Sequence, residues 1–168
     1  MASDQVGRGA GRQQPCDTSP MADTTNPVTV LDEGRCWDLM AGQQLGRLAT
    51  ALDGLPEIFP VNFAVDGESI VFRTAEGSKL LEIVVNSSVA FEVDSWNDEG
   101  GWSVVARGGA EIVTGDAQVA RVEALPLMPW VPTVKTNFVR IDVTEISGRS
   151  FVFGPDPIEK YRYGHRRV

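Results

Sequence analysis

Two basic and two hydroxyl side chains cluster in one short stretch of the sequence. Arg73 and Thr74 end a run rich in β-branched and aromatic residues, and Ser78 and Lys79 follow after a short polar bend. The apolar run LLEIVV comes next and predicts a helix from about residue 78 to 85. The start of a helix offers unpaired backbone N–H groups and the positive end of the helix dipole, which favour a phosphate. The stretch therefore predicts a site for a phosphate-bearing ligand.

The same charges have a simpler interpretation. Isolated basic residues beside a turn are usually solvated, and Arg73 and Lys79 taken alone fit that description. Their combination with two hydroxyl groups and the start of a helix favours the phosphate site.

Alternating apolar patterns surround this stretch and must position it. They predict strands at 45–52, 57–65, 70–74, 88–94 and 102–114. Asp66-Gly67 predicts a tight hairpin turn before the third of these strands. Pro60 has no N–H to donate, so its strand is expected to be bulged or to lie at an edge, where a ligand could meet the backbone. Gly108-Gly109 predicts a bulge or a sharp bend.

The remaining elements complete a mainly β (α+β) pattern. One short helix is expected after Asp32, its N-cap, and a second over 116–125 with Asp116 as its cap. Near the end of the domain, the sequence predicts two strands, 137–143 and 150–153, joined by a turn at Ser147-Gly148. Six or seven strands in a mostly antiparallel order favour a small closed barrel over a doubly wound parallel sheet.

Length and composition divide the chain into three parts. The 168 residues suffice for one domain with a hydrophobic core. Residues 1–27 are polar and rich in Gly, Gln and Ser, which predicts a disordered leader. Residues 28–154 form the predicted domain, and 155–168 form a basic tail. The leader lacks the apolar core of a secretory signal and no apolar run could span a membrane, so we expect a cytoplasmic protein without membrane contact.

Composition also excludes several classes of chemistry. The net charge of −8 disfavours nucleic acid as a partner. The two cysteines, Cys16 and Cys36, have no metal-ligand spacing, and the single histidine, His165, lies in the tail. We therefore expect no zinc site of the usual Cys/His kind and no Ser-His-Asp apparatus within the domain.

Seven short motifs give the chain a family resemblance. In order they are GRLA, PVNF, IVFRT, GSKL, VAFEVD, GWSVV and GxAE, spread over residues 30–153. Together they resemble the pyridoxamine 5′-phosphate oxidase-like flavoproteins, most closely the branch that contains the nitroimidazole-resistance proteins. The resemblance implies a six-stranded antiparallel split β-barrel with short flanking helices. It also implies a homodimer that binds FMN in clefts between the two subunits.

The resemblance assigns three groups of cofactor-binding positions. They are the phosphate clamp Arg73, Thr74, Ser78 and Lys79; the strand along the flavin ring, Pro60, Val61 and Asn62; and a covering strand, often from the second subunit, with Trp102 and Ser103. Trp102 has an equally good interpretation as a core residue, since aromatic residues on strands mostly pack inside. The substrate motif of the founding enzyme is not visible in the tail GPDPIEKYRYGHRRV, and Leu80 stands where a second basic residue is expected. The resemblance therefore does not extend to oxidation of pyridoxamine phosphate.

Two functions remain open at this point. One is an FMN-dependent oxidoreductase that reduces a small electron-poor substrate by two-electron transfer, with catalytic residues not assigned. The other is a flavin-binding or carrier protein without turnover. FMN is favoured over FAD because the sequence has no dinucleotide-binding glycine fingerprint, and a deazaflavin is the alternative cofactor. Trp130, in the Pro-rich segment 126–132, is the candidate for shaping the space over the flavin.

Overall fold

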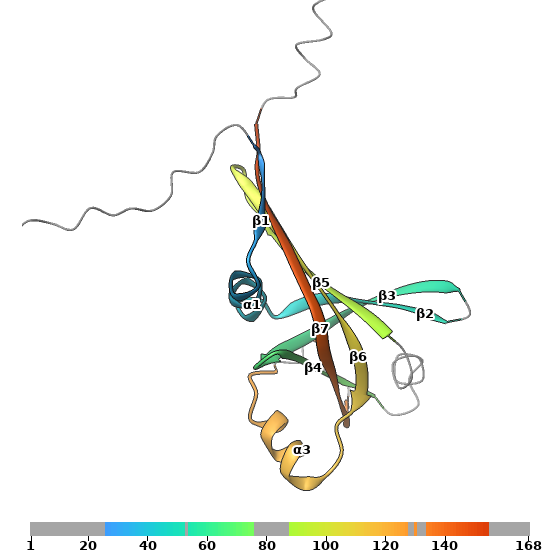
Figure 1. Ribbon diagram of the computed structural model, residues 1–168. Coiled ribbons are helices and arrows are strands. Elements are labelled where there is room, and N and C mark those ends of the chain that lie inside the picture. Colours follow the sequence, from blue (N-terminus) through green and yellow to red (C-terminus); the bar gives the residue numbers. More distant parts are fainter. Residues whose placement is uncertain (1–25, 53, 76–87, 128–129, 131–133, 155–168) are drawn as a thin grey trace, which may run out of the picture.

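The computed structural model describes residues 26–52, 54–75, 88–127, 130 and 134–154 of the chain. Within these ranges it contains seven strands and two helices (Figure 1). They are β1 (Val28–Leu31), α1 (Glu33–Ala41), β2 (Leu45–Leu52), β3 (Leu55–Asp66), β4 (Ser69–Thr74), β5 (Ser88–Trp96), β6 (Gly100–Ile112), α3 (Asp116–Glu123) and β7 (Asn137–Val152). The expected helix at 78–85, the tail 155–168 and residues 1–25 of the leader lie outside the described residues.

Six of the strands close into a ring. The order is β7-β4-β3-β2-β5-β6, and β6 pairs back onto β7. Every pairing is antiparallel. β1 is added outside the ring, against the last part of β7. The predicted mainly β class and the six-stranded split barrel are thus confirmed, and β1 is a strand that the sequence patterns did not indicate.

β3 is shared between two neighbours along its length. Its residues 55–62 pair with β2, and its residues 63–66 pair with β4. The hairpin at Asp66-Gly67 is confirmed: Asp66 pairs with Ser69, and Gly67 has a φ of 65°, which suits glycine. The outer part of the β2–β3 hairpin projects from the barrel as an arm (Figure 1).

The expected turn at Ser147-Gly148 is wrong, because β7 is one continuous strand of 16 residues. Ser147 and Gly148 pair with Val105 and Val104 of β6. The glycine has a packing reason instead. A Cβ at Gly148 would lie 2.7 Å from Cys36 Sγ, so α1 packs on β7 only where β7 has no side chain.

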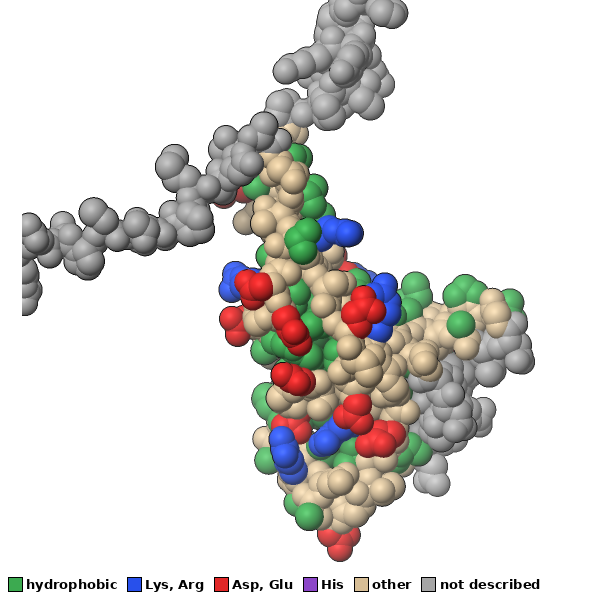
Figure 2. Space-filling model, in the orientation of Figure 1, with side chains coloured by type: hydrophobic (Ala, Val, Ile, Leu, Met, Phe, Trp, Pro, Cys, Tyr) green, Lys and Arg blue, Asp and Glu red, His purple; other side chains and the backbone are tan. Residues whose placement is uncertain are grey.

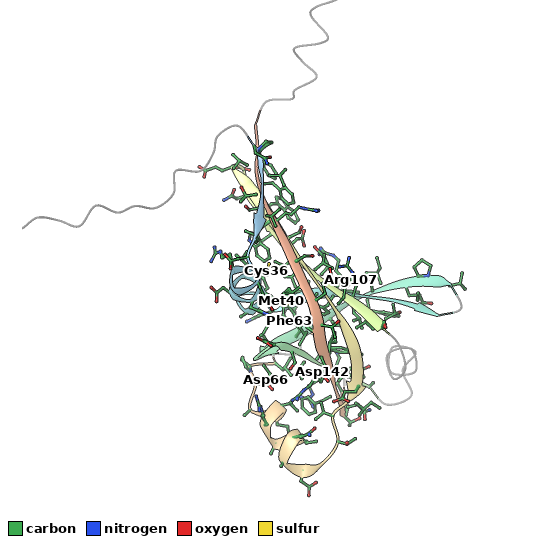
Figure 3. The ribbon with its side chains drawn as sticks, in the orientation of Figure 1. Cys36, Met40, Phe63, Asp66, Arg107 and Asp142 are labelled. Carbon is green, nitrogen blue, oxygen red and sulfur yellow. The ribbon has the colours of Figure 1, made fainter. Side chains whose placement is uncertain are left out.

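α1 closes one side of the barrel core. The side chain of Asp32 accepts a hydrogen bond from the backbone N–H of Arg35 (2.8 Å), which confirms Asp32 as the N-cap. Cys36 and Met40 of α1 are fully buried in the same cluster as Phe63 (Figure 3). The rings of Phe63 and Phe91 meet edge to face with their centroids 4.9 Å apart. Cys36 is therefore a core residue, and its burial raises the pKa of its thiol.

α3 covers the barrel beside the β3–β4 turn. Asp116 is not its cap, because the N-cap is Gly115, whose φ of 86° turns the chain out of β6 without a side-chain hydrogen bond. Asp116 is already in the first turn, where its carboxylate faces the positive end of the helix dipole. Asp66 ties α3 to the barrel by accepting from Arg121 (2.7 Å) and Arg140 (3.4 Å).

Candidate functional site

Within the described residues, β3 and β4 diverge and leave part of each strand edge without a strand partner, and we call the space between these edges the gap. Phe63 and Phe72 form the last pair between the two strands. Beyond them, the described strand pairings join Pro60–Asn62 to β2 only and Arg73–Thr74 to β7 only. Two groups of residues from the sequence prediction therefore lie on opposite sides of the same gap, each with one strand edge turned towards it.

The β3 side of the gap presents main-chain hydrogen-bonding groups. Phe63 donates its N–H to the carbonyl of Gln44 (3.2 Å), on the side of β2. Main-chain groups of successive residues alternate between the two edges of a strand, so those of Asn62 and Pro60 are directed towards the gap. Pro60 has no N–H to leave unpaired there. This edge offers one donor and two acceptors, which suits a flat ring with a polar edge.

The side chains of this strand have other roles. Val61 is 7 % exposed and belongs to the core. Asn62 donates from Nδ2 to the carbonyl of Gln44 (3.2 Å) and accepts at Oδ1 from the backbone N–H of Trp130 (3.3 Å). Asn62 thus holds the backbone of Trp130 next to the gap.

Arg73 is the cation on the β4 side. Its Nη2 donates to the carbonyl of Lys135 (2.6 Å), and its Cζ lies 4.8 Å from the centroid of the Phe138 ring. Its Nε is buried and has no hydrogen-bond partner. Among the residues that the structure describes, no acid forms an ion pair with it. A partly buried guanidinium that no described acid neutralises is suited to binding an anion.

Thr74 does not share the face of Arg73. Successive side chains of a strand point to opposite faces, and Thr74 is 4 % exposed on the inner face. The two side chains therefore do not converge on one point, as the sequence pattern suggested. Ser78 and Lys79, the other two members of the predicted clamp, lie outside the described residues.

Trp102 and Ser103 lie at the other end of the molecule. Trp102 pairs with Ser150 of β7, whereas Arg73 pairs with Phe138 of the same strand. At about 3.3 Å per residue, these two points of β7 are roughly 40 Å apart. One small ligand could not touch both Arg73 and Trp102 of a single chain. Trp102 is half-buried and packs against the main core, as its alternative interpretation expected.

Lys135, Phe138 and Gln44 complete the surroundings of the gap, and the sequence patterns did not single them out. Two of them act through backbone carbonyls, which any residue type supplies, so no residue signal could have found them. Phe138 carries a weak signal, because it opens the predicted strand at 137–143. Within the described ranges, no group of three or more His, Cys, Asp or Glu could hold a metal ion. No described helix is long and apolar enough to cross a membrane.

Comparison with known proteins identifies the fold and the family. A family model described as pyridoxamine 5′-phosphate oxidase matches residues 32–150. The chain belongs to this family. An uncharacterised protein of Mycobacterium tuberculosis is 46 % identical over 93 residues, which cover 55 % of this chain and 84 % of that protein.

Two solved structures extend the comparison within the pyridoxamine 5′-phosphate oxidase fold. An FAD binding protein from Mycobacterium smegmatis is 42 % identical with a TM-score of 0.69, covering 74 % of this chain and 99 % of that one. A 5-nitroimidazole antibiotic resistance protein from Bacteroides thetaiotaomicron is 12 % identical with a TM-score of 0.62, covering 76 % and 90 %. At that identity the second similarity concerns the fold alone.

Proposed function

We propose that this member of the pyridoxamine 5′-phosphate oxidase family binds a flavin nucleotide in the gap between β3 and β4. The observation that carries the proposal is the Arg73 guanidinium, which is partly buried, is not paired with any described acid and stands across the gap from a strand edge that no described strand pairs with. The FAD bound by the Mycobacterium smegmatis relative supports a flavin.

Each side of the gap has its own task in this proposal. Arg73, with Ser78 and Lys79 from the sequence prediction, holds the phosphate. The main-chain groups of Asn62 and Pro60 meet the polar edge of the flavin ring. When bound, the flavin supplies two-electron transfer, so the protein needs few proton-transfer groups of its own. This agrees with a described region that contains no histidine.

The identity of the nucleotide is the first experiment. We expect FMN, since the predicted basic clamp is compact and no dinucleotide fingerprint exists, although the relative binds FAD. Absorbance and mass spectrometry of the small molecule released from the purified full chain distinguish FMN, FAD and a deazaflavin. Recovery of a deazaflavin, or of no flavin after incubation with FMN and FAD, would contradict the proposal.

We further propose an oxidoreductase that passes two electrons from a nicotinamide donor to a small electron-poor compound. Stopped-flow mixing of the flavin-loaded protein with NADPH or NADH should bleach the flavin absorbance, and a nitro-aromatic compound or a quinone should restore it. If neither nicotinamide bleaches the flavin, and chemically reduced deazaflavin does not either, a flavin carrier becomes the better account.

A symmetric homodimer is the expected assembly. Trp102 of β6 pairs with β7 too far from Phe138 to reach the gap of its own chain, so it covers the flavin only from a second copy. The arm formed by β2 and β3 also exposes Leu55 (70 %) and Ile58 (66 %), apolar side chains that suit a subunit contact (Figure 2). Light scattering at micromolar concentration should give twice the mass of the chain. A flavin-loaded monomer would contradict this prediction.

A further inference from the structure

Three cross-strand neighbours form a slot at the β5–β6 end of the barrel. Trp96 of β5 pairs with Gly101 of β6, and Gly101 pairs with Phe151 of β7. The two aromatic residues are therefore separated by two strand spacings, roughly 9.6 Å between backbones. Gly101 places no side chain between them, and a Cβ there would lie 2.9 Å from the Cβ of Trp96. The strand register thus places the side chains of Trp96 and Phe151 on either side of Gly101, which forms the base of the slot.

The slot is open, and its walls are aromatic. It belongs to a cleft of about 250 Å³ that Phe153 and Trp102 also line. A dry apolar cavity of about 150 Å³ accepts benzene, so this cleft has room for one aromatic ring. Trp96 is 69 % exposed and Phe153 is 50 % exposed. Exposed aromatic side chains gathered around a hollow are typical of a binding surface.

The charges around the slot are acidic. Glu92 and Asp94 line the same cleft, and Glu99 lines the adjoining hollow at the β5–β6 turn. No basic residue is among the described residues that line either hollow. The Arg47 guanidinium, on β2, donates hydrogen bonds to Asp94 (2.6 Å) and Glu92 (2.9 Å). These hydrogen bonds raise the pKa of Arg47, and the bond to Asp94 has the larger effect. Glu99 has no ion pair within the described part of the chain, so the mouth of the slot keeps its negative charge.

We propose that this slot binds a planar aromatic cation between Trp96 and Phe151. The faces of aromatic rings carry partial negative charge and attract a cation, and a flat ring can stack on them. The free carboxylate of Glu99 adds to the preference for positive charge and opposes an anionic ligand.

Two probes with the same ring and opposite charges test the proposal. Isothermal calorimetry of the flavin-free full chain compares 1-methylquinolinium, a flat aromatic cation, with quinoline-3-carboxylate, an anion with the same ring system. We expect the cation to bind at least tenfold more tightly than the carboxylate. Trp96→Ala should weaken the cation about tenfold, and Glu99→Gln should reduce the preference for the cation about threefold. Val30→Ala is the control, since it truncates an apolar side chain on β1 that is 76 % exposed and is not among the residues that line the cleft.

Several results would overturn the proposal. Equal affinities for the two probes would show that charge does not determine binding. Unchanged affinity in Trp96→Ala would show that the cation does not bind in the slot. If the cation does not bind and Trp96→Ala converts a dimer into a monomer by light scattering, the slot is a subunit contact instead. Because the calorimetry needs no flavin, these outcomes are independent of whether the chain binds one.

Discussion

Replacing Arg73 and Lys79 together with alanine is expected to weaken FMN binding by at least a hundredfold. Each charge-assisted hydrogen bond to a phosphate is worth about 1.5–3 kcal/mol, and every 1.4 kcal/mol is tenfold in affinity. Arg73→Ala alone should cost at least tenfold, because the guanidinium is already partly desolvated and its Nε has no protein partner. Fluorescence titration of the flavin-free protein with FMN measures both losses.

Riboflavin separates the phosphate contact from damage to the fold. It has the same ring system and no phosphate, so its affinity should change little in both variants. Arg107→Ala provides the matched protein control, since Arg107 is an exposed arginine on β6 that pairs with Glu145 (2.9 Å). Unchanged FMN affinity in the double variant would mean that the phosphate lies elsewhere. Equal losses for FMN and riboflavin would mean that Arg73 acts only by holding Lys135 and Phe138 in place.

Local patterns were sufficient for most of the barrel. The alternation of apolar residues predicted five of the strands, and Asp66-Gly67 predicted the hairpin that β3 and β4 form. Pro60 marked the edge that turns out to face the gap, because the lack of an N–H is a property of the residue itself. These features are determined by residues close together in the chain, so they can be predicted from local sequence patterns.

The features that failed depend on residues distant in the chain. Gly148 suggested a turn, but it is required for the close approach of Cys36 from α1, which no local pattern shows. The gap itself exists because β3 changes partners after Asn62, a consequence of the whole strand order. Arg73 and Trp102 pair with positions that lie up to roughly 40 Å apart along β7, and the wrongly predicted turn had divided this strand in two. Residue types therefore suggested candidate positions, whereas the distances between those positions depend on the whole strand order.

The Gly108-Gly109 pair lies at an irregularity in the pairing of β6 with β7. The sequence indicated a bulge, and the register of β6 against β7 shifts between Arg107 and Gly108. A Cβ at Gly108 would overlap the carbonyl oxygen of Asp142, an atom of the facing backbone (Figure 3 labels Asp142). Gly108→Ala must therefore push β6 and β7 apart. We expect a loss of about 3 kcal/mol in the free energy of unfolding, or roughly 6–12 °C in Tm, measured by chemical and thermal denaturation.

The neighbouring glycine supplies the control. A Cβ at Gly109 meets no atom within 4 Å, and its backbone has no positive φ. Gly109→Ala adds the same methyl group one residue along the same strand, so its effect should stay within about 0.5 kcal/mol. Similar losses in both variants would mean that the bulge tolerates no side chain at either position, and steric contact with Asp142 would not be the cause. A stable Gly108→Ala variant would show that β7 can move away from β6 at low cost, because nothing else at that position could relieve the contact.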